Sequence, residues 1–228
     1  MSAFETGAHT MSTLTVPRRP SADAAPSRLE RLKAQPRKPG EASFFWYETQ
    51  FKSEAVKVLP GEYFVHNKDL LIMTTLGSCI AACLWDRNAQ VGGLNHFMLP
   101  EGTSDSGRYG SYAMELLINE MMKRGASRSS LEAKVFGGGQ VIQGMDSMNV
   151  GERNTRFVLD YLKTERIPVV SKDVLDVYPR KVCFLPASGK AMVKRLASTH
   201  TATLVAQERA AATQAAPTAT GGGSIDLF

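Results

Sequence analysis

A succession of short apolar stretches, each four to eight residues long, restricts most strongly how this chain can fold. Aliphatic and aromatic side chains dominate the stretches, and polar or glycine-containing segments separate them, which is typical of β-strands. We therefore expect strands at residues 55–59, 70–75, 79–85, 92–99, 133–136, 167–170, 182–185 and 191–195.

Two longer segments have the spacing of helices. Residues 112–124 place apolar side chains on one helical face and end before Gly125, a typical residue after a helix. Residues 150–164 follow Asn149, a good N-cap, and Glu152 completes a capping box. Because strands outnumber helices and neighbouring strands look hairpin-linked, we expect an α+β fold. It would be a layered sandwich of mostly antiparallel or mixed sheets with two main helices, not a doubly wound sheet.

The ends of the chain differ from its middle in composition. Residues 1–42 are rich in proline, alanine, serine and arginine, and they contain too few large apolar side chains to offset the entropy of ordering. We expect a disordered basic tail there, with room for a short helix near residues 29–34. Residues 205–228 are rich in alanine, threonine and glycine and are predicted to be a flexible tail. The folded domain is predicted at residues 43–204.

Charge and cysteine content limit the functional class. The formal net charge is +5, and the first 42 residues supply +3 of it (seven Lys and Arg against four Asp and Glu), so the domain itself gives little reason to expect nucleic-acid binding. No apolar run approaches the roughly 18–20 residues that span a bilayer, and the N-terminus lacks a secretory pattern. Three sparse cysteines argue against a disulfide framework. We therefore expect a cytoplasmic protein.

The stretch LGSCIAACLWD raises the main question about chemistry, because Cys79 directly follows Gly77 and Ser78. If residues 86–89 form the turn of a hairpin, paired residue numbers sum to 175 and Cys79 lies opposite His96. Directly opposed side chains have Cβ atoms about 4.5–5.5 Å apart, close enough for a thiol to transfer its proton to an imidazole.

An inert, buried thiol is the alternative interpretation of Cys79, and on geometry alone it is favoured, because free cysteine is among the most buried residue types. Cys83 and Cys183 have no opposed histidine and are predicted to be core residues. Backbone N–H groups near Gly77 and Ser78 would suit an oxyanion hole if Cys79 were a nucleophile. The hairpin register therefore decides between the two interpretations of Cys79.

A set of short sequence motifs in the domain resembles the CheD family of chemoreceptor glutamine deamidases from bacterial chemotaxis. The resemblance covers about residues 55–197. The motifs are LGSC at 76–79, GGLNHFMLP at 92–100, RY at 108–109, KVFGGG at 134–139, VGERN at 150–154, RKVCF at 180–184 and SGK at 188–190.

The resemblance implies a Cys-His-Thr catalytic set on a sandwich similar to the cytotoxic necrotizing factor deamidase domain. Cys79 matches the nucleophile and His96 the base. The family's threonine lies six residues before the cysteine, where this chain has Met73. A one-residue deletion in the turn would bring Thr74 into that role, and we favour it over Thr75.

The mechanism implied by the resemblance needs no metal or cofactor. A Cys79 thiolate attacks the side-chain amide of a receptor glutamine, and the resulting thioester is hydrolysed to glutamate. Gly77 and Ser78 belong to the predicted oxyanion site. Gly138, within the Gly-Gly-Gly-Gln run, is predicted to line the substrate cleft, although a plain glycine turn is an equal alternative.

The family also implies which molecules the protein meets. Its substrate would be the helical cytoplasmic region of methyl-accepting chemoreceptors, so the protein would be peripheral to membrane receptors. A CheC-type phosphatase is a further implied partner, nucleic acid is not, and we expect a monomer. The alternative function is a non-catalytic adaptor that binds receptors or the phosphatase. One segment departs from the family, because residues 173–180 lack its glycines, and a different backbone path is expected there.

Overall fold

The structure, a computed structural model, describes residues 25–99, 106–141 and 150–197 together with residues 206 and 210. Three α-helices, ten strands and one short 3-10 helix make up the described part of the chain. Their order is α1 (Arg28–Ala34), β1 (Phe44–Glu48), β2 (Ser53–Lys57), β3 (Tyr63–His66), β4 (Leu71–Leu76), β5 (Ile80–Asp86), β6 (Val91–Phe97), α2 (Ser106–Met122), η1 (Arg128–Ser130), β7 (Leu131–Gly137), α3 (Val150–Thr164), β8 (Val169–Val174), β9 (Arg180–Leu185) and β10 (Lys190–Arg195).

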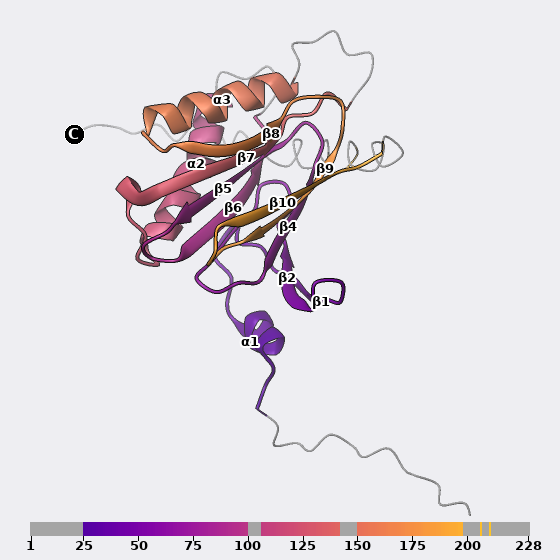
Figure 1. The fold of residues 1–228 in the computed structure, drawn as a ribbon, viewed down its shortest axis with the longest axis vertical. Helices are drawn as coiled ribbons and strands as arrows, with labels where there is room; N and C mark the ends of the chain where they lie inside the picture. The colour runs from indigo at the N-terminus through magenta and orange to yellow at the C-terminus, as the bar shows by residue number, and fades with distance from the viewer. Residues whose placement is uncertain (1–24, 100–105, 142–149, 198–205, 207–209, 211–228) are drawn as a thin grey trace, which may run out of the picture.

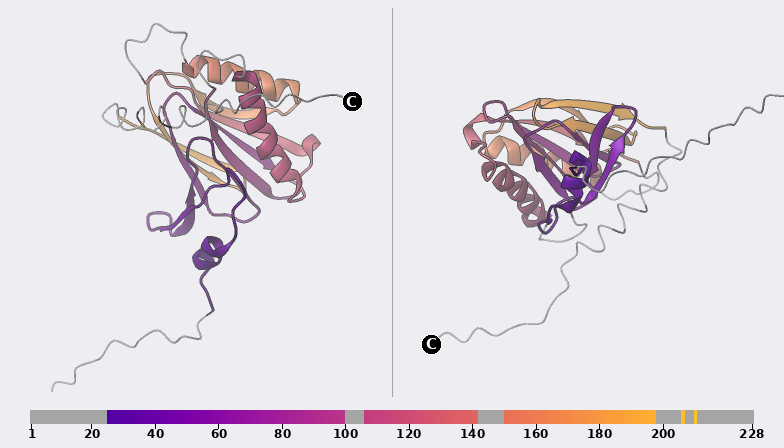
Figure 2. Two further views of the ribbon diagram at one scale, coloured as in Figure 1. Left: turned by 180° about the vertical axis from the view of Figure 1, so that it is seen from behind. Right: turned by 90° about the horizontal axis from the view of Figure 1, so that it is seen from below.

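The strands form two stacked sheets of five strands each (Figure 1). The central sheet has the order β3-β6-β5-β7-β8, and the outer sheet has the order β1-β2-β4-β9-β10. Most neighbours are antiparallel, but β2 and β4 pair in parallel, as do β7 and β8. Helices α2 and α3 cover the face of the central sheet that points away from the outer sheet (Figure 2). The expected α+β layered sandwich with mixed sheets and two main helices is confirmed.

Side-chain alternation along β5 shows why its sequence is almost continuously apolar. Ile80, Ala82 and Leu84 pack under the two helices, while Ala81 and Cys83 pack between the two sheets. A strand that is buried on both faces has no solvent-facing side, so its sequence is apolar throughout and does not alternate with polar residues. The central sheet is therefore the middle layer of the molecule, and residues at the ends of its strands lie between two cores.

The predicted elements are present, with bounds that differ by a few residues. Helix α3 has the predicted bounds, whereas α2 begins six residues before the expected residue 112. Strands β1 and β3 were not predicted from the sequence. β1 lies at the edge of its sheet with Phe44 and Tyr47 exposed, and β3 has only four residues, so neither shows a clear apolar alternation. No helix among the described residues is long and apolar enough to span a membrane.

The hairpin register differs from the expectation by two residues. Paired numbers in β5 and β6 sum to 177, so Ala81 lies opposite His96, and the expected pairing of Cys79 with His96 is wrong. Cys79 immediately precedes β5. Because the shift is by two, continuing the alternation keeps Cys79 on the same face as His96, in a diagonal rather than a direct relationship.

Asp86 explains the shift. We expected it in the turn, but it is the last residue of β5 and is only 1% exposed. Its carboxylate accepts hydrogen bonds within the turn and from the segment that precedes β7. The donors are the backbone N–H groups of Asn88, Ala89 and Ser127 and the hydroxyl of Ser130. These bonds hold Asp86 in the strand and move the four-residue loop to residues 87–90.

The folded body begins before residue 43. Helix α1 carries a capping box between Ser27 and Glu30, and Leu32 and Ala42 are buried in the core between the sheets. Leu32 and Ala42, which lie in the segment that was expected to be a disordered tail, therefore pack against the domain. Residues 1–24 and nearly all of 205–228, where tails are predicted, lie outside the described residues.

Candidate active site

A hydrogen bond between the two sheets joins Thr74 to His96. Thr74 lies on β4 of the outer sheet and His96 near the end of β6 in the central sheet, and both are 2% exposed. The Thr74 Oγ1 atom is 2.8 Å from His96 Nδ1 and 2.8 Å from the carbonyl oxygen of Val58. A carbonyl can only accept, so the single hydroxyl hydrogen goes to Val58 and the hydroxyl accepts from Nδ1–H. Nε2 therefore carries the lone pair of neutral His96, as a general base requires.

Alternation along β4 explains why Thr74, and neither of its neighbours, reaches the histidine. Met73 packs in the small apolar cluster on the outward face of the outer sheet. Thr75 lies two positions from Met73 and therefore faces the same way. Ile72 and Leu76 pack between the sheets, on the side of Thr74. Of the three adjacent positions, Thr74 is the one with the geometry of the third member of a triad.

Cys79 is fully buried between the two sheets. Continuing the register of β5 and β6 by one residue would put it opposite Met98, next to His96 along the diagonal. It also lies within electrostatic reach of Tyr109 on α2. Burial raises the pKa of Tyr109, and negative charge on Cys79 raises this pKa further. The candidate nucleophile, the histidine and the threonine thus come from β4, β6 and the turn between β4 and β5.

Three successive carbonyl groups of that turn are each held by a hydrogen bond from another element. Across a trans peptide the C=O of one residue and the N–H of the next point in opposite directions. Fixing these carbonyls therefore fixes the directions of the N–H groups of Ser78 and Cys79, as an oxyanion hole requires. The bonds are Gly139 N–H to the Gly77 carbonyl (2.8 Å), Asn154 Nδ2 to the Ser78 carbonyl (2.9 Å) and Gly138 N–H to the Cys79 carbonyl (2.8 Å).

The glycine run after β7 makes these close approaches possible. Gly137 has φ +109°, and a Cβ there would lie 2.1 Å from the Cys79 carbonyl oxygen. Gly138 has φ +67°, and a Cβ there would lie 2.1 Å from Oγ1 of Thr155 on α3. Both glycines are buried. Gly138 therefore contacts the Cys79 turn through its backbone N–H, which donates to the Cys79 carbonyl. Its predicted place in a substrate cleft stays a prediction.

Asn154 connects the segments that carry the cysteine and the histidine. Its side chain is completely buried on α3. Besides the bond from Nδ2 to Ser78, its Oδ1 atom accepts a hydrogen bond of 3.0 Å from the backbone N–H of Leu99, which follows β6. Asn154 thus donates to one backbone group and accepts from another, and its two hydrogen bonds are structural.

Tyr109 was part of a family motif, but its place near the site could not be read from the sequence. A Cβ on Gly61 would lie 3.8 Å from the Tyr109 hydroxyl, and the Gly61 N–H donates a 2.7 Å hydrogen bond to the His96 carbonyl. The phenol therefore lies near both the cysteine and the backbone of the histidine. Its half-buried position on the first turns of α2 is a feature of the fold, so the sequence alone did not indicate a role at the site.

The segment that lacks the family's glycines, residues 173–180, contains two non-glycine residues with positive φ. Leu175 and Asp176 adopt φ values of +64° and +68°, so non-glycine residues take a left-handed path that glycine would adopt more easily. Two hydrogen bonds to the glycine run hold this conformation. The Leu175 N–H donates to the Gly137 carbonyl at 2.9 Å, and the Gln140 N–H donates to the Asp176 carbonyl at 2.7 Å.

The other two cysteines are core residues, as predicted. Cys83 packs between the sheets, and burial raises its thiol pKa. Cys183 lies on β9 in the outward-facing cluster, where burial also raises its pKa. Among the residues that the structure describes, no group of three His, Cys, Asp or Glu side chains could hold a metal ion.

Comparison with known proteins identifies the family. A family model described as CheD chemotactic sensory transduction matches residues 98–195. The "Probable chemoreceptor glutamine deamidase CheD 1" of Albidiferax ferrireducens is 63% identical over 209 residues, which cover 91% of this chain and 89% of that protein. This chain belongs to the CheD family.

Other CheD proteins are similar over most of their length. The relative of the same name from Dechloromonas aromatica is 55% identical over 72% of this chain and 84% of its own, and the "Probable chemoreceptor glutamine deamidase CheD" of Thiobacillus denitrificans is 50% identical over 82% and 96%. Among solved structures, the hypothetical protein YfiH of Bacillus licheniformis matches with a TM-score of 0.32 and 10% identity over 50% of this chain and 49% of its own, which is too low to support an argument. The expected likeness to the cytotoxic necrotizing factor domain stays a prediction.

The CheD motifs meet at the candidate site although they are distant in the sequence. LGSC forms the end of β4 and the turn to β5, and the histidine of GGLNHF is on β6. The glycines of KVFGGG and the asparagine of VGERN hold the carbonyls of the LGSC turn. Four motifs that are far apart in the sequence thus form one hydrogen-bonded unit around Cys79.

Proposed function

We propose that this protein is a protein-glutamine deamidase that converts glutamine side chains of methyl-accepting chemoreceptors to glutamate. The observation that carries the proposal is the buried Thr74–His96 hydrogen bond, which leaves Nε2 as the basic nitrogen on the face shared with Cys79. Membership of the CheD family supports the choice of receptor glutamine as substrate. The target glutamines lie in the cytoplasmic region of receptors, so the enzyme works in the cytoplasm.

The reaction begins with proton transfer from Cys79 Sγ to His96 Nε2. The thiolate attacks the side-chain amide carbon of the glutamine, and the negative charge moves to the amide oxygen. The N–H groups of Ser78 and Cys79, whose directions are fixed by the carbonyl hydrogen bonds, stabilise this oxyanion. The C–N bond breaks as imidazolium gives its proton to the leaving ammonia, which leaves a thioester on Cys79.

Hydrolysis of the thioester completes the cycle. His96 takes a proton from water, hydroxide adds to the thioester carbon, and the C–S bond breaks to release glutamate and regenerate the thiol. The net reaction consumes one water and yields one carboxylate and one ammonium ion. Thr74 touches neither reactant. It keeps the imidazole in the Nδ1–H tautomer through both steps, as the third member of a Ser-His-Asp triad does.

The proposal includes partners beyond the substrate. A CheC-type phosphatase and a monomeric state in peripheral contact with membrane receptors follow from the family resemblance. An adaptor without catalysis would need neither a fixed histidine tautomer nor held carbonyls in the cysteine turn, and the presence of both favours the enzyme.

Peptide mass spectrometry of a receptor cytoplasmic fragment tests this function. Incubation with the wild-type protein is expected to add about one mass unit at specific glutamines, whereas Cys79→Ala and His96→Ala are expected to leave the fragment unchanged. Cys183→Ala is the matched control, because it removes a thiol on the other side of the outer sheet and is expected to retain activity. Unmodified receptor after incubation with folded wild-type protein would refute the deamidase function for that receptor.

A further inference from the structure

Arg180 is the largest side chain that is fully buried among the described residues, with an exposed fraction of 0%. It is the first residue of β9, and alternation along this strand points its side chain between the two sheets, as it does for Val182 and Phe184. A guanidinium in such a place is costly unless it is paired and hydrogen-bonded. The chemistry proposed at Cys79 does not itself use this charge, so its contacts must explain it.

The guanidinium of Arg180 joins β9 of the outer sheet to β8 of the central sheet. Its Nε donates a 2.9 Å hydrogen bond to Oδ1 of Asp173, and Nη2 lies 2.8 Å from the same oxygen. Its Nη1 donates a 3.0 Å hydrogen bond to the carbonyl of Tyr178. Burial raises the pKa of Asp173, but the hydrogen bonds and charges of Arg180 and Arg195 outweigh burial and leave this pKa below its ordinary value. One ionised pair therefore holds both sides of the loop at 175–179.

This loop in turn holds the glycine run after β7. The Leu175 N–H donates to the Gly137 carbonyl at 2.9 Å, and the Gln140 N–H donates to the Asp176 carbonyl at 2.7 Å. Leu175 and Asp176 have positive φ values, which residues other than glycine adopt at a cost, so surrounding contacts must impose them. The contacts of Arg180 on both sides of the loop supply this restraint.

Arg180 also lies next to the cysteine turn. It pairs with Leu76, the last residue before that turn, in the register of β4 and β9. A Cβ on Gly139 would lie 3.4 Å from Nη1 of Arg180 and 3.2 Å from the Gly77 carbonyl oxygen. The guanidinium therefore packs against the glycine whose N–H donates to that carbonyl. Arg180 thus acts on the turn by two routes, through the loop and through Gly139.

We propose that Arg180 is a positioning residue for deamidation. By holding the 175–179 loop and Gly139, it fixes the direction of the Gly77 carbonyl. The Ser78 N–H points the opposite way across the same peptide, toward the oxyanion that it stabilises. The guanidinium contacts the protein and not the substrate. The inference rests on the proposed function and adds to it the residue that keeps the oxyanion site in shape.

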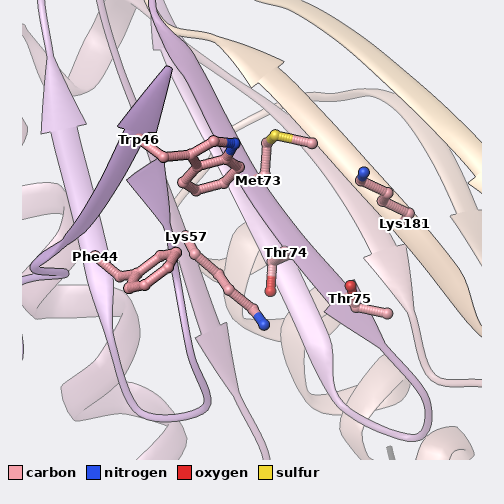
Figure 3. A pocket seen from close by; sticks show the side chains of 7 residues that line it. All are labelled: Phe44, Trp46, Lys57, Met73, Thr74, Thr75 and Lys181. Atoms are coloured by element: carbon pink, nitrogen blue, oxygen red, sulfur yellow. The ribbon is translucent and has the colours of Figure 1, made fainter. Parts of the chain in front are cut away.

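The test exchanges arginine and lysine at two adjacent positions of the full chain. Arg180→Lys keeps the charge but loses the planar fork that donates to Asp173 and Tyr178 at once. Lys181→Arg is the control and makes the reverse exchange at the next residue of β9. Lys181 points to the other side of the sheet, where it lines a pocket of about 310 Å³ together with Thr75 (Figure 3). Thermal unfolding establishes that both variants are folded at the assay temperature.

A second variant tests the same contact from its acidic partner. Asp173→Glu keeps the ion pair but moves the carboxylate by one methylene, and the side chain of Asp173 is 25% exposed, so the fold should tolerate the change. This variant decides the test if Arg180→Lys does not fold.

Deamidation is measured by mass spectrometry on a short neutral peptide that contains the target glutamine. Arg180→Lys is expected to lower kcat at least about tenfold with KM within about twofold of wild type, because oxyanion stabilisation acts on the transition state alone. Asp173→Glu should lower kcat several-fold, and Lys181→Arg should match wild type. Wild-type kcat in both Arg180→Lys and Asp173→Glu would overturn the proposal.

Alkylation of Cys79 by iodoacetamide separates positioning of the oxyanion site from an effect on the thiolate. Alkylation depends on the thiolate but forms no oxyanion, so its pH profile in Arg180→Lys should coincide with that of wild type. A shifted profile would show that Arg180 acts on the charge of Cys79 and would overturn the proposal.

Hydrogen exchange tests the positioning without turnover. In Arg180→Lys the backbone N–H groups of residues 139–140 should exchange at least about threefold faster than in wild type and in Lys181→Arg, because their acceptors are held less firmly. Unchanged exchange at these residues would overturn the proposal. A wild-type protein that does not deamidate, together with faster exchange in Arg180→Lys, would refute the deamidase function and leave the positioning of the turn established.

Discussion

Asn154 and Ser78 are 76 residues apart in the sequence, yet a 2.9 Å hydrogen bond joins the side-chain amide of the first to the carbonyl of the second. The same amide accepts from the Leu99 N–H, so one buried side chain fixes the ends of two strands relative to each other. One strand follows the candidate nucleophile and the other carries the candidate base. Helix α3 therefore holds the backbone on both sides of the candidate site.

Replacing Asn154 by leucine should destabilise the fold, because it leaves two buried backbone groups without their hydrogen bonds. Each such group costs about 1–3 kcal/mol, so a loss of about 2–6 kcal/mol in the free energy of unfolding is expected. Urea denaturation measures it. Asn119→Leu, an exposed position on α2, is the control and should change stability by no more than about 0.5 kcal/mol. Equal effects of the two substitutions would contradict the role given to Asn154.

Thr74→Val should lower kcat by about 100-fold or more, because it removes the acceptor for Nδ1–H and releases the histidine tautomer on which base catalysis depends. Thr74→Ser keeps the hydroxyl and should restore most of the activity. Thr75→Val is the matched control, because it changes the neighbouring residue that faces outward. Steady-state kinetics on the neutral glutamine peptide measure all three. A Thr74→Val enzyme with wild-type kcat would show that the threonine has no role in catalysis.

Two glycine substitutions distinguish the energetic cost of a strained backbone from the cost of a steric collision. Gly137 and Gly125 both have positive φ, but a Cβ at Gly137 would collide with the Cys79 carbonyl, while nothing lies within 4 Å of a Cβ at Gly125. Gly125→Ala should therefore cost only about 1–2 kcal/mol of strain. Gly137→Ala should cost clearly more and should also reduce deamidation. Thermal unfolding of both variants tests the comparison, and similar melting temperatures would argue against the close contact.

Asp86 should make the protein sensitive to acid. Burial raises the pKa of this carboxylate, but hydrogen bonds from Ser130, Ser127, Ala89 and Asn88 outweigh burial and leave the pKa below its ordinary value. A carboxylate with a lowered folded-state pKa contributes stability that is present above the unfolded-state pKa and is lost as pH falls through the folded-state pKa. Stability should therefore decline below about pH 4.

The Asp86→Asn variant tests this expectation. It should be less stable than wild type at pH 7, and the difference should shrink as the pH is lowered toward 2. Asp160→Asn, at an exposed position on α3, serves as the control. Urea denaturation across this pH range gives the free energies. A difference between Asp86→Asn and wild type that stays constant with pH would exclude Asp86 as a source of the acid sensitivity.

Local sequence pattern was enough to predict most elements but not the hairpin register. The register depends on Asp86, whose stabilising partners Ser127 and Ser130 are 41 and 44 residues away. No pattern within the hairpin itself contains that information. The choice of Thr74 over Thr75 came from counting residues against the family motif, and the fold gives it a physical reason, because only alternate residues of β4 face the histidine.

The supporting residues of the site could not be predicted for the same reason. The glycine run at residues 137–139 was predicted either to line the substrate cleft, through Gly138, or to form a plain turn. Its hydrogen bonds to the carbonyls of the cysteine turn appear only when β7 lies beside β5. The left-handed conformations of Leu175 and Asp176 oppose their intrinsic preference and are held by bonds to that same run. In both cases long-range contacts override the local preference.

Covalent catalysis by Cys79 predicts a detectable intermediate, which can be followed in a single turnover with enzyme in excess over a receptor fragment. The reaction is quenched with acid at successive times and mapped by mass spectrometry. We predict a transient adduct on the peptide that contains Cys79, lighter than the sum of enzyme and substrate peptides by one ammonia, about 17 mass units, which decays as the glutamate product rises. Glutamate formation at the same rate by Cys79→Ala would rule out covalent catalysis by Cys79.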